Sequence, residues 1–512
     1  MFDIDCQSVL NQFVYDPQNP MIFSTGIFLF LFLGFTLIYN ILGKQTTLRL
    51  LFVTAFSYFF YYKSSGTYFF LLFIVSLSDF ILARLIYKNN AQAGLLSEDS
   101  VKAKKLPSNR LLLSLSLLVD VGILIYFKYT NFFGECWANI TGGHWDALDI
   151  FLPVGVSFFT FQSMSYTFDV YRGNLKPLNN FLDYAFFVSF FPQLVAGPIV
   201  RAKDFIPQIR KPLFVSKEMF GRAIFLIIVG LFKKAVISDY ISVNFVDRVF
   251  DQPDLYTGME NLLATYGYAI QIYCDFSGYS DMAIGIALML GFTFPKNFDA
   301  PYKSQSITEA WRRWHISLSS WLKDYVYISF GGNRHGLFRQ CVNLMLTMLI
   351  GGLWHGASMT FILWGGLHGL LLVIEKLYMV IRRKFNPAYN IATRRSGFHG
   401  FIRTFITFHI FIFLWILFRS PDMDSTLTFI WNIGNNFSLD VLFQWIGGYW
   451  GVALLMLIGL VSHFLPARYS DYFQSRITNM PLIGQALLIV VVIFIVIQVK
   501  SADVQPFIYF QF

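Results

Sequence analysis

Long apolar runs separated by short polar segments recur along the whole chain. They lie at residues 21–42, 48–62, 67–86, 111–128, 181–196, 222–239, 261–290, 338–352, 357–378, 401–418, 447–465 and 481–499. A helix needs about 20 apolar residues to cross a bilayer. Because several runs are short, we expect eleven or twelve crossings and an all-α polytopic fold. The run 152–168, interrupted by Pro153, Gly155 and Gln162, fits a re-entrant or cavity-lining segment better than a lipid-facing helix.

The composition supports a membrane protein. Of the 512 residues 55% are hydrophobic and only 13% are charged, whereas soluble domains carry about 25% charged residues. This imbalance excludes an ordinary soluble protein, and the high hydrophobic content also excludes a disordered chain. We expect one membrane domain over residues 21–500, preceded by an extracytoplasmic segment 1–20 and followed by an aromatic tail 501–512.

The positions of the charges predict an orientation. Lysine and arginine concentrate in residues 84–110, 201–222 and 376–403, whereas the segments 129–151 and 420–450 contain acidic residues and no basic ones. Basic loops stay cytoplasmic, so both termini are expected on the extracytoplasmic side of the membrane. The net charge of +9 therefore reflects topology, and we expect membrane lipids rather than nucleic acid as partners.

Residues 311–325 predict an amphipathic helix. Its apolar face repeats at helical spacing and holds Trp311, Trp314, His315, Leu318, Trp321, Leu322 and Tyr325. Arg312 and Arg313 lie on the opposite side. An interfacial helix with aromatic side chains at headgroup depth is the simplest interpretation, but a titratable ring such as His315 on an apolar face needs a partner or a purpose.

A second histidine lies in the sequence G-G-L-W-H-G-A-S, residues 351–358, between two apolar runs. Polar groups at membrane depth are costly and tend to be paired or functional. His355 is therefore either a neutral ring bonded to a carbonyl between close-packed helices or a base that accepts a proton from a hydroxyl group.

A third polar segment, Q-I-Y-C-D-F-S-G-Y-S-D, spans residues 271–281 of an apolar run. On a helix Gln271, Asp275 and Tyr279 share one face. Buried carboxylates are usually paired, so a scaffold role is the simpler expectation for Asp275. The signatures of soluble hydrolases, P-loop proteins and dinucleotide-binding proteins are absent, and no residue spacing indicates a metal site.

Five motifs together resemble the membrane-bound O-acyltransferases, in particular the bacterial branch similar to alginate O-acetyltransferase. They are F-P-Q-L-V-A-G-P-I (191–199), the segment 271–281, N-F-D-A-P-Y (297–302), W-R-R-W-H-I-S-L (311–318) and G-G-L-W-H-G (351–356). The likeness implies that His355 is the principal catalytic residue and that His315 is the second, more cytoplasmic histidine. It also implies re-entrant and interfacial helices around a central channel.

The resemblance implies a reaction as well. An acyl thioester, acetyl-coenzyme A or an acylated carrier protein, would arrive from the cytoplasm, and a polysaccharide such as alginate or peptidoglycan would accept the acetyl group outside. Trp311, Trp314, Arg312 and Arg313 would hold the anionic donor at the inner mouth of the channel, with Asp275 and Gln271 lining it. By analogy, a partner protein similar to an extracytoplasmic acetyltransferase or esterase would complete the transfer.

The chain printed here ends in P-F-I-Y-F-Q-F. An aromatic anchor at the outer interface is one explanation. Related acyl-transfer systems end in a similar aromatic motif with one tyrosine, which implies Tyr509 as a covalent acyl relay. Alternatives to acetyl transfer are D-alanyl transfer to teichoic acid, acylation of a lipid or protein, and, from another class, a secondary transporter or polysaccharide flippase. The histidine pair without inverted repeats favours an acyltransferase over a transporter.

Overall fold

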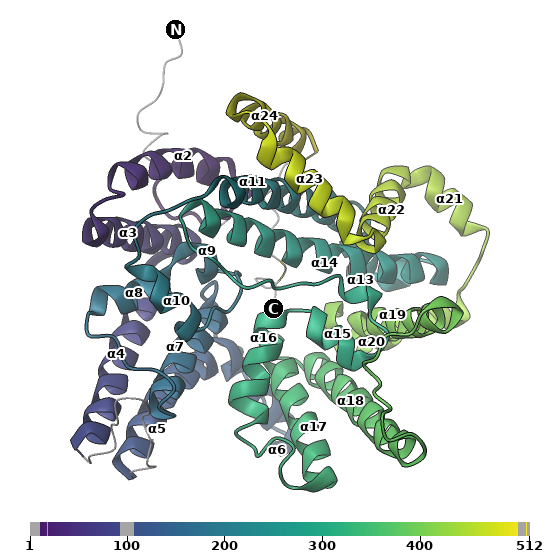
Figure 1. Cartoon of the computed structure of the whole chain (residues 1–512). Helices are drawn as coiled ribbons and strands as arrows, with labels where there is room; N and C mark the ends of the chain where they lie inside the picture. Colours follow the sequence, from purple (N-terminus) through teal and green to yellow (C-terminus); the bar gives the residue numbers. More distant parts are fainter. Residues whose placement is uncertain (1–10, 18, 93–106, 500–507, 509–512) are drawn as a thin grey trace. The chain divides into compact units, whose positions relative to one another are not determined.

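The computed structural model describes residues 11–17, 19–92, 107–499 and 508, and these are mostly helical (Figure 1). No β-strand occurs within these ranges. The expected all-α fold of a multi-pass membrane protein is confirmed. Five described segments are long and apolar enough to cross a membrane, and a bent pair of helices adds a sixth if it counts as one span. The five are Thr46–Gln92, Pro107–Thr141, Gly336–His355, Met359–Phe385 and Gly397–Arg419.

Other apolar runs form elements that do not meet this test. The run 181–196 is divided between α8 (Phe181–Ser189) and α9 (Phe191–Leu194), and α2 (Gly26–Ile41) has 16 residues. Because a full crossing takes about 20 residues, length and composition identify fewer spans than the eleven or twelve expected. The run that begins at residue 152 forms α7 (Val156–Tyr171), a helix buried along nearly its whole length.

The chain forms two compact units. The first unit comprises Met1–Ala223 and Ala283–Pro295, and the second comprises Ile224–Met282 and Lys296–Phe512. Two helices contribute residues to both units, α11 (Lys217–Leu231) and α14 (Gly258–Met289).

The first unit is built around aromatic packing. Its other helices are α3 (Thr46–Ser65), α4 (Phe69–Gln92), α5 (Pro107–Leu124), α6 (Thr130–Thr141) and α10 (Ala202–Ile209). The buried ring of Phe191 lies within 6.5 Å of six phenylalanine rings from residues 23–60. Such a cluster packs densely through edge and face contacts between the rings.

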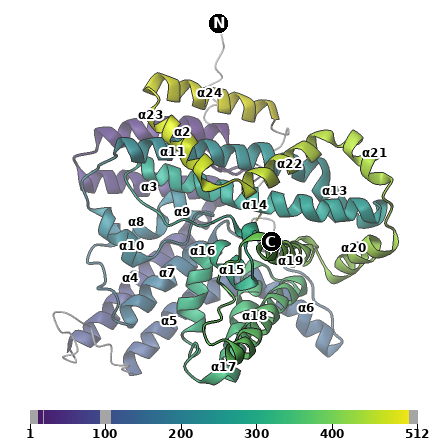
Figure 2. The ribbon, with the colours of Figure 1, turned by 45° about the vertical axis from the view of Figure 1, so that its right-hand side comes forward.

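The second unit contains the histidine motifs. Its helices include α13 (Asp247–Asp251), α15 (Ile307–Arg313), α16 (Ile316–Trp321), α17 (Gly336–His355), α18 (Met359–Phe385), α19 (Gly397–Arg419), α20 (Met423–Asn435), α21 (Val441–Gly448), α22 (Trp450–Phe464), α23 (Ala467–Asn479) and α24 (Leu482–Val499). Figure 2 shows α17 and α18 side by side as a hairpin. Wider π-helical turns follow α11, at Phe232–Ser238, and α16, at Leu322–Tyr327; such turns are frequent at functional sites.

Candidate functional site

His355 is the last residue of α17 and is 2% exposed. Its ring meets three aromatic rings nearly edge to face, with centroid distances of 4.9 Å to Trp354, 5.2 Å to Trp364 and 5.1 Å to Phe418. The helix ends here because Gly356 is extended and Ser358 begins the next helix, its hydroxyl accepting from the amide of Thr360. The imidazole is thus held in an aromatic cage at a helix end.

Close packing of α17 on α18 sets the position of that helix end. At Gly352 an added Cβ would lie 2.3 Å from the carbonyl oxygen of Phe361, and at Gly365 it would lie 2.4 Å from that of Met348. Only glycine allows the two backbones to approach this closely. Gly352 and Gly365 therefore let α17 and α18 pack closely, and this packing places Trp364 of α18 against His355.

The continuous amphipathic helix expected over 311–325 is wrong, because the helix breaks at His315. α15 ends at Arg313, Trp314 is extended, and His315 adopts a left-handed conformation with φ 40° before α16 begins. The backbone of Asn297–Asp299 supplies the reason: the amide of Asp299 donates to Arg313, and the amide of Ile316 donates to Asn297. These bonds from a neighbouring segment replace helical ones, an interaction that helical periodicity cannot reveal.

The break turns His315 into the interior, where it is fully buried. Its ring lies 4.5 Å from Phe276 and 5.9 Å from Trp354, measured between centroids. Burial lowers the pKa of His315 to about 3, so the ring is neutral at physiological pH. Trp354 contacts both histidines, and the structure thereby brings the two predicted residues around one indole.

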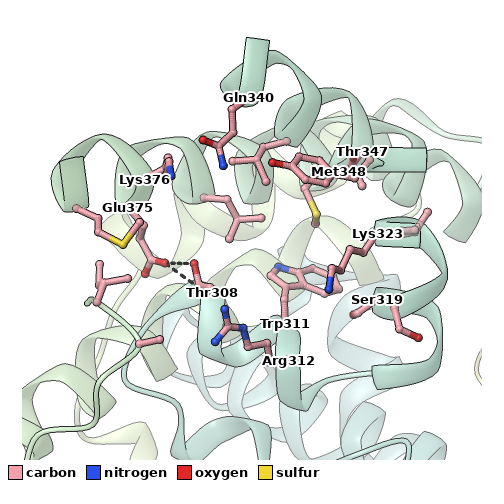
Figure 3. Close-up of a pocket in the computed structure, with 18 of the residues that line it drawn as sticks. Thr308, Trp311, Arg312, Ser319, Lys323, Gln340, Thr347, Met348, Glu375 and Lys376 are labelled. Carbon is pink, nitrogen blue, oxygen red and sulfur yellow. Dashed lines mark hydrogen bonds between the residues drawn. The ribbon is translucent and has the colours of Figure 1, made fainter. Parts of the chain in front are cut away.

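A cavity of about 650 Å³ opens beside α15, α16, α17 and α18 (Figure 3). Its lining includes the basic side chains of Arg312, Lys323, Lys376 and Arg383. The carboxylate of Glu375 also faces the cavity, but it accepts hydrogen bonds from the amides of Ile307 and Thr308 and from the Thr308 hydroxyl. The Glu375 carboxylate therefore caps the start of α15, where the helix dipole stabilises a negative charge.

The cavity suits an anionic ligand. Within the part of the chain that the structure describes, Arg312, Lys323 and Lys376 form no ion pair. Guanidinium and ammonium groups bind phosphates strongly, and the indole of Trp311 adds an apolar wall. The lining therefore combines these cationic groups, unpaired within the described residues, with an apolar wall.

Two tryptophans connect the cavity with His355. Trp311 lines the cavity, and its ring centroid lies 5.7 Å from that of Trp364, which in turn contacts His355. The Trp311 indole also donates to Nδ1 of His368 at 3.3 Å. His368 is fully buried and orients this indole, which accounts for a third histidine in the region.

The other two residues predicted to hold a donor have different surroundings. Arg313 binds Glu309 at 2.9 Å and Asp299 at 3.3 Å, and Trp314 is 1% exposed and packs on Trp415. Neither lines the cavity. The sequence did not predict Lys323 and Gln340 as residues of this site. Its basic segment 376–403 predicted only the orientation of the chain, although Lys376 and Arg383 of that segment line the cavity.

Asp275 and Gln271 lie on α14 within a separate buried network. The ammonium of Lys234, in the π-helical turn after α11, donates to Asp275 at 2.5 Å and lies 2.8 Å from Asp239. Gln271 donates to the Ser242 hydroxyl at 2.8 Å. These contacts give both residues a structural role in holding α14 against the π-helical turns.

Asp275 has one further partner. The backbone amide of Ile508 donates to Asp275 at 3.0 Å, and Ile508 is 3% exposed. Tyr509, the next residue in the sequence, lies outside the described residues. No group of three or more metal-binding side chains occurs in the described ranges.

Comparison with known proteins shows the family of this chain. The model of the membrane-bound O-acyltransferase family matches residues 174–418. A probable alginate O-acetylase, AlgI, of Pseudomonas aeruginosa is 39% identical over 79% of this chain and 73% of its own length. The chain belongs to the membrane-bound O-acyltransferase family. It is therefore an enzyme that transfers acyl groups to hydroxyl groups, and the transporter alternative falls away.

Other members of the family are similar to different extents. A peptidoglycan O-acetyltransferase of Helicobacter pylori is 39% identical over 62% of this chain and 63% of its own length. A teichoic acid D-alanyltransferase of Bacillus subtilis is 28% identical over 52% of this chain and 68% of its own length. The relatives support membrane O-acetylation more strongly than D-alanyl transfer.

Proposed function

We propose that this acyltransferase moves acetyl groups from a cytoplasmic thioester across the inner membrane to hydroxyl groups of an extracytoplasmic polysaccharide. The observation that carries the proposal is the pairing of a caged His355 with a basic cavity through Trp311 and Trp364. Alginate and peptidoglycan are the two acceptor classes that the relatives' names support.

In the proposed reaction His355 is the general base. Its neutral imidazole takes the proton of an acceptor hydroxyl while the oxygen attacks the thioester carbonyl carbon; the carbon–sulfur bond then breaks, and the proton passes to the departing thiolate. Base catalysis of this kind is worth about 10²- to 10⁴-fold in rate. His315, neutral and on the other side of Trp354, holds that indole in place and contacts the donor's acyl end.

The donor is an acetyl thioester of coenzyme A or of a carrier protein. Arg312, Lys323 and Lys376 bind its phosphate groups in the cavity, and the thioester reaches toward His355 along the Trp311 and Trp364 rings.

The test uses membranes of a host that makes the polysaccharide but lacks its own acetylase. His355→Ala should reduce ester-linked acetate on the polysaccharide by about 10²-fold or more. His399→Ala is the matched control, because His399 is exposed and lies outside the site. Immunoblots of the membranes establish equal amounts of each protein.

Undiminished acetylation by His355→Ala would refute the assignment of the base. Supplying labelled acetyl-coenzyme A, acetylated carrier protein or D-alanylated carrier protein to the same vesicles identifies the donor. Transfer of D-alanine alone would replace the proposed acetyl chemistry with that of the teichoic acid enzyme.

The proposal includes a relay at the end of the chain. Tyr509 accepts the acetyl group on its phenol oxygen, and a partner protein outside moves it to the polysaccharide. The hydrogen bond from the Ile508 amide to buried Asp275 supports this relay, because it binds the residue before Tyr509 to α14. Gln271, another residue predicted to line the channel, lies on the same helix.

A further inference from the structure

The first unit contains a second buried polar cluster, apart from the histidine site. Asp79 on α4 and Asp120 on α5 are both 0% exposed. Each lies within a segment apolar enough to span a membrane. No lysine or arginine of the described ranges forms an ion pair with either carboxyl group. Two carboxyl groups without a cation in such a place need another explanation.

Asp79 is surrounded by hydroxyl donors. Ser116 of α5 donates to Oδ1 and Ser163 of α7 donates to Oδ2, each at 2.5 Å. The hydroxyls of Ser163 and Tyr184 are 2.8 Å apart. Both oxygens of Asp79 act as acceptors, and hydrogen bonds this short are typical of a hydroxyl that donates to a charged oxygen. Of the two carboxyl groups, Asp79 is therefore the better placed to carry a negative charge.

Asp120 has the opposite environment. Neither of its oxygens accepts a hydrogen bond from any described group, yet its carboxyl group lies within hydrogen-bonding reach of Asp79. The fully buried hydroxyl of Thr167 lies near Asp79. Like the Asp120 carboxyl group, it makes no hydrogen bond of good geometry with any described group. A charged Asp120 would be an unsolvated anion beside another anion, which is strongly unfavourable. A protonated Asp120 would instead donate a hydrogen bond to Asp79.

We propose that Asp79 and Asp120 form a proton-binding site, in which Asp120 holds the proton and donates it in a hydrogen bond to the ionised Asp79. The ligand of this site is one proton, and its binding joins α4 to α5 and, through Ser163 and Tyr184, to α7 and α8. Release of the proton leaves two adjacent anions and separates the helices.

The other titratable groups near the pair are few. Tyr166 on α7 and Tyr184 on α8 face it, and Arg84 on α4 acts on Tyr166 from a more distant position. Arg84 donates to the carbonyl oxygen of Asn179 at 3.2 Å rather than to a carboxylate. Both tyrosines are neutral hydroxyl groups at physiological pH. The net charge of the cluster therefore depends on whether the shared proton is bound.

Paired substitutions of the full-length protein distinguish the two carboxyl groups. Asp120→Asn keeps a neutral donor toward Asp79 and should preserve the Tm, whereas Asp79→Asn loses an acceptor oxygen and should lower it. Asp120→Leu removes the donor and should lower the Tm as well. Asp149→Asn is the control, because Asp149 is exposed and should behave like the parent protein.

Infrared spectroscopy of the protein in lipid at neutral pH tests the proton directly. The parent protein should show the carbonyl band of a buried carboxylic acid, and this band should be missing from Asp120→Asn and retained in Asp149→Asn. Absence of the band in the parent protein would overturn the proposal, as would equal loss of Tm in Asp120→Asn and Asp79→Asn. A Tm that rises with sodium concentration in a parent protein without the band would assign the site to a metal cation instead.

Discussion

At the scale of single residues, the site depends on which charges are already neutralised. Arg313 is held by Glu309 and Asp299, and Glu375 is held by the start of α15. The remaining basic side chains of the cavity, including Arg312, Lys323 and Lys376, can therefore act on a ligand. Neighbouring arginines in the sequence thus have different roles, because one is paired and the other faces the cavity.

We expect Lys323→Gln combined with Lys376→Gln to raise the KM for an anionic thioester donor by about three- to tenfold with little change in kcat. The reason is that phosphate contacts stabilise the bound donor and the transition state equally. Initial rates with purified enzyme at several donor concentrations measure both constants. Lys44→Gln, at an exposed position, should leave them unchanged; an equal effect from Lys44→Gln would show a general loss of charge rather than binding in the cavity.

At the scale of elements, the α17 and α18 hairpin determines the position of His355, the proposed base. His355 follows directly from a helix whose backbone touches its neighbour at Gly352 and Gly365. The π-helical turn Leu322–Tyr327 brings Lys323 and Tyr327 to the cavity. A helix end therefore positions His355, and an irregular turn positions Lys323.

Gly352→Ala should destabilise the hairpin and reduce acetyl transfer, because its Cβ would lie 2.3 Å from a backbone carbonyl oxygen that cannot move independently. Overpacking of this kind costs about 1–3 kcal/mol. Gly366→Ala on α18 is the matched control, since its Cβ would meet only a Leu349 side-chain carbon at 3.5 Å. Thermal unfolding and transfer assays should separate the two variants; equal stability would contradict the packing argument.

At the scale of the whole molecule, the proposed acyl-transfer site and the proposed proton site belong to different units. The histidines, the cavity and the Asp275 network all belong to the second unit, and the Phe191 cluster and the Asp79–Asp120 pair belong to the first. Ile508 also belongs to the second unit and donates its amide to Asp275, and this contact supports the relay proposed at Tyr509.

Tyr509→Phe should abolish transfer to the polysaccharide and leave hydrolysis of the thioester donor intact, because the phenol oxygen is the proposed acyl carrier. Mass spectrometry of the C-terminal peptide should find an acetyl group in the parent protein and none in the variant. Tyr469→Phe changes an exposed tyrosine and should have no effect. Full transfer by Tyr509→Phe would remove the relay from the mechanism.

Sequence reasoning could predict much of the fold and the identity of the two histidines. Apolar run lengths indicated helices, and the motif G-G-L-W-H-G, residues 351–356, marked both His355 and the close packing around it. The break at His315 could not be predicted, since it depends on backbone hydrogen bonds from Asn297–Asp299. Helical periodicity describes a helix only as long as no other segment competes for its amides.

By itself, the sequence determined that the solvent is lipid, that the fold is all helical and that the chain resembles an acyltransferase family. Composition, run length and local motifs are properties of neighbouring residues and need no tertiary contact. The tertiary structure decided that Trp354 lies between two histidines, that Arg312 faces the cavity while Arg313 is paired, and that Asp79 meets Asp120. The contacts of His315 with Trp354 and of Asp79 with Asp120 join residues far apart in the chain, and packing alone brings such residues together.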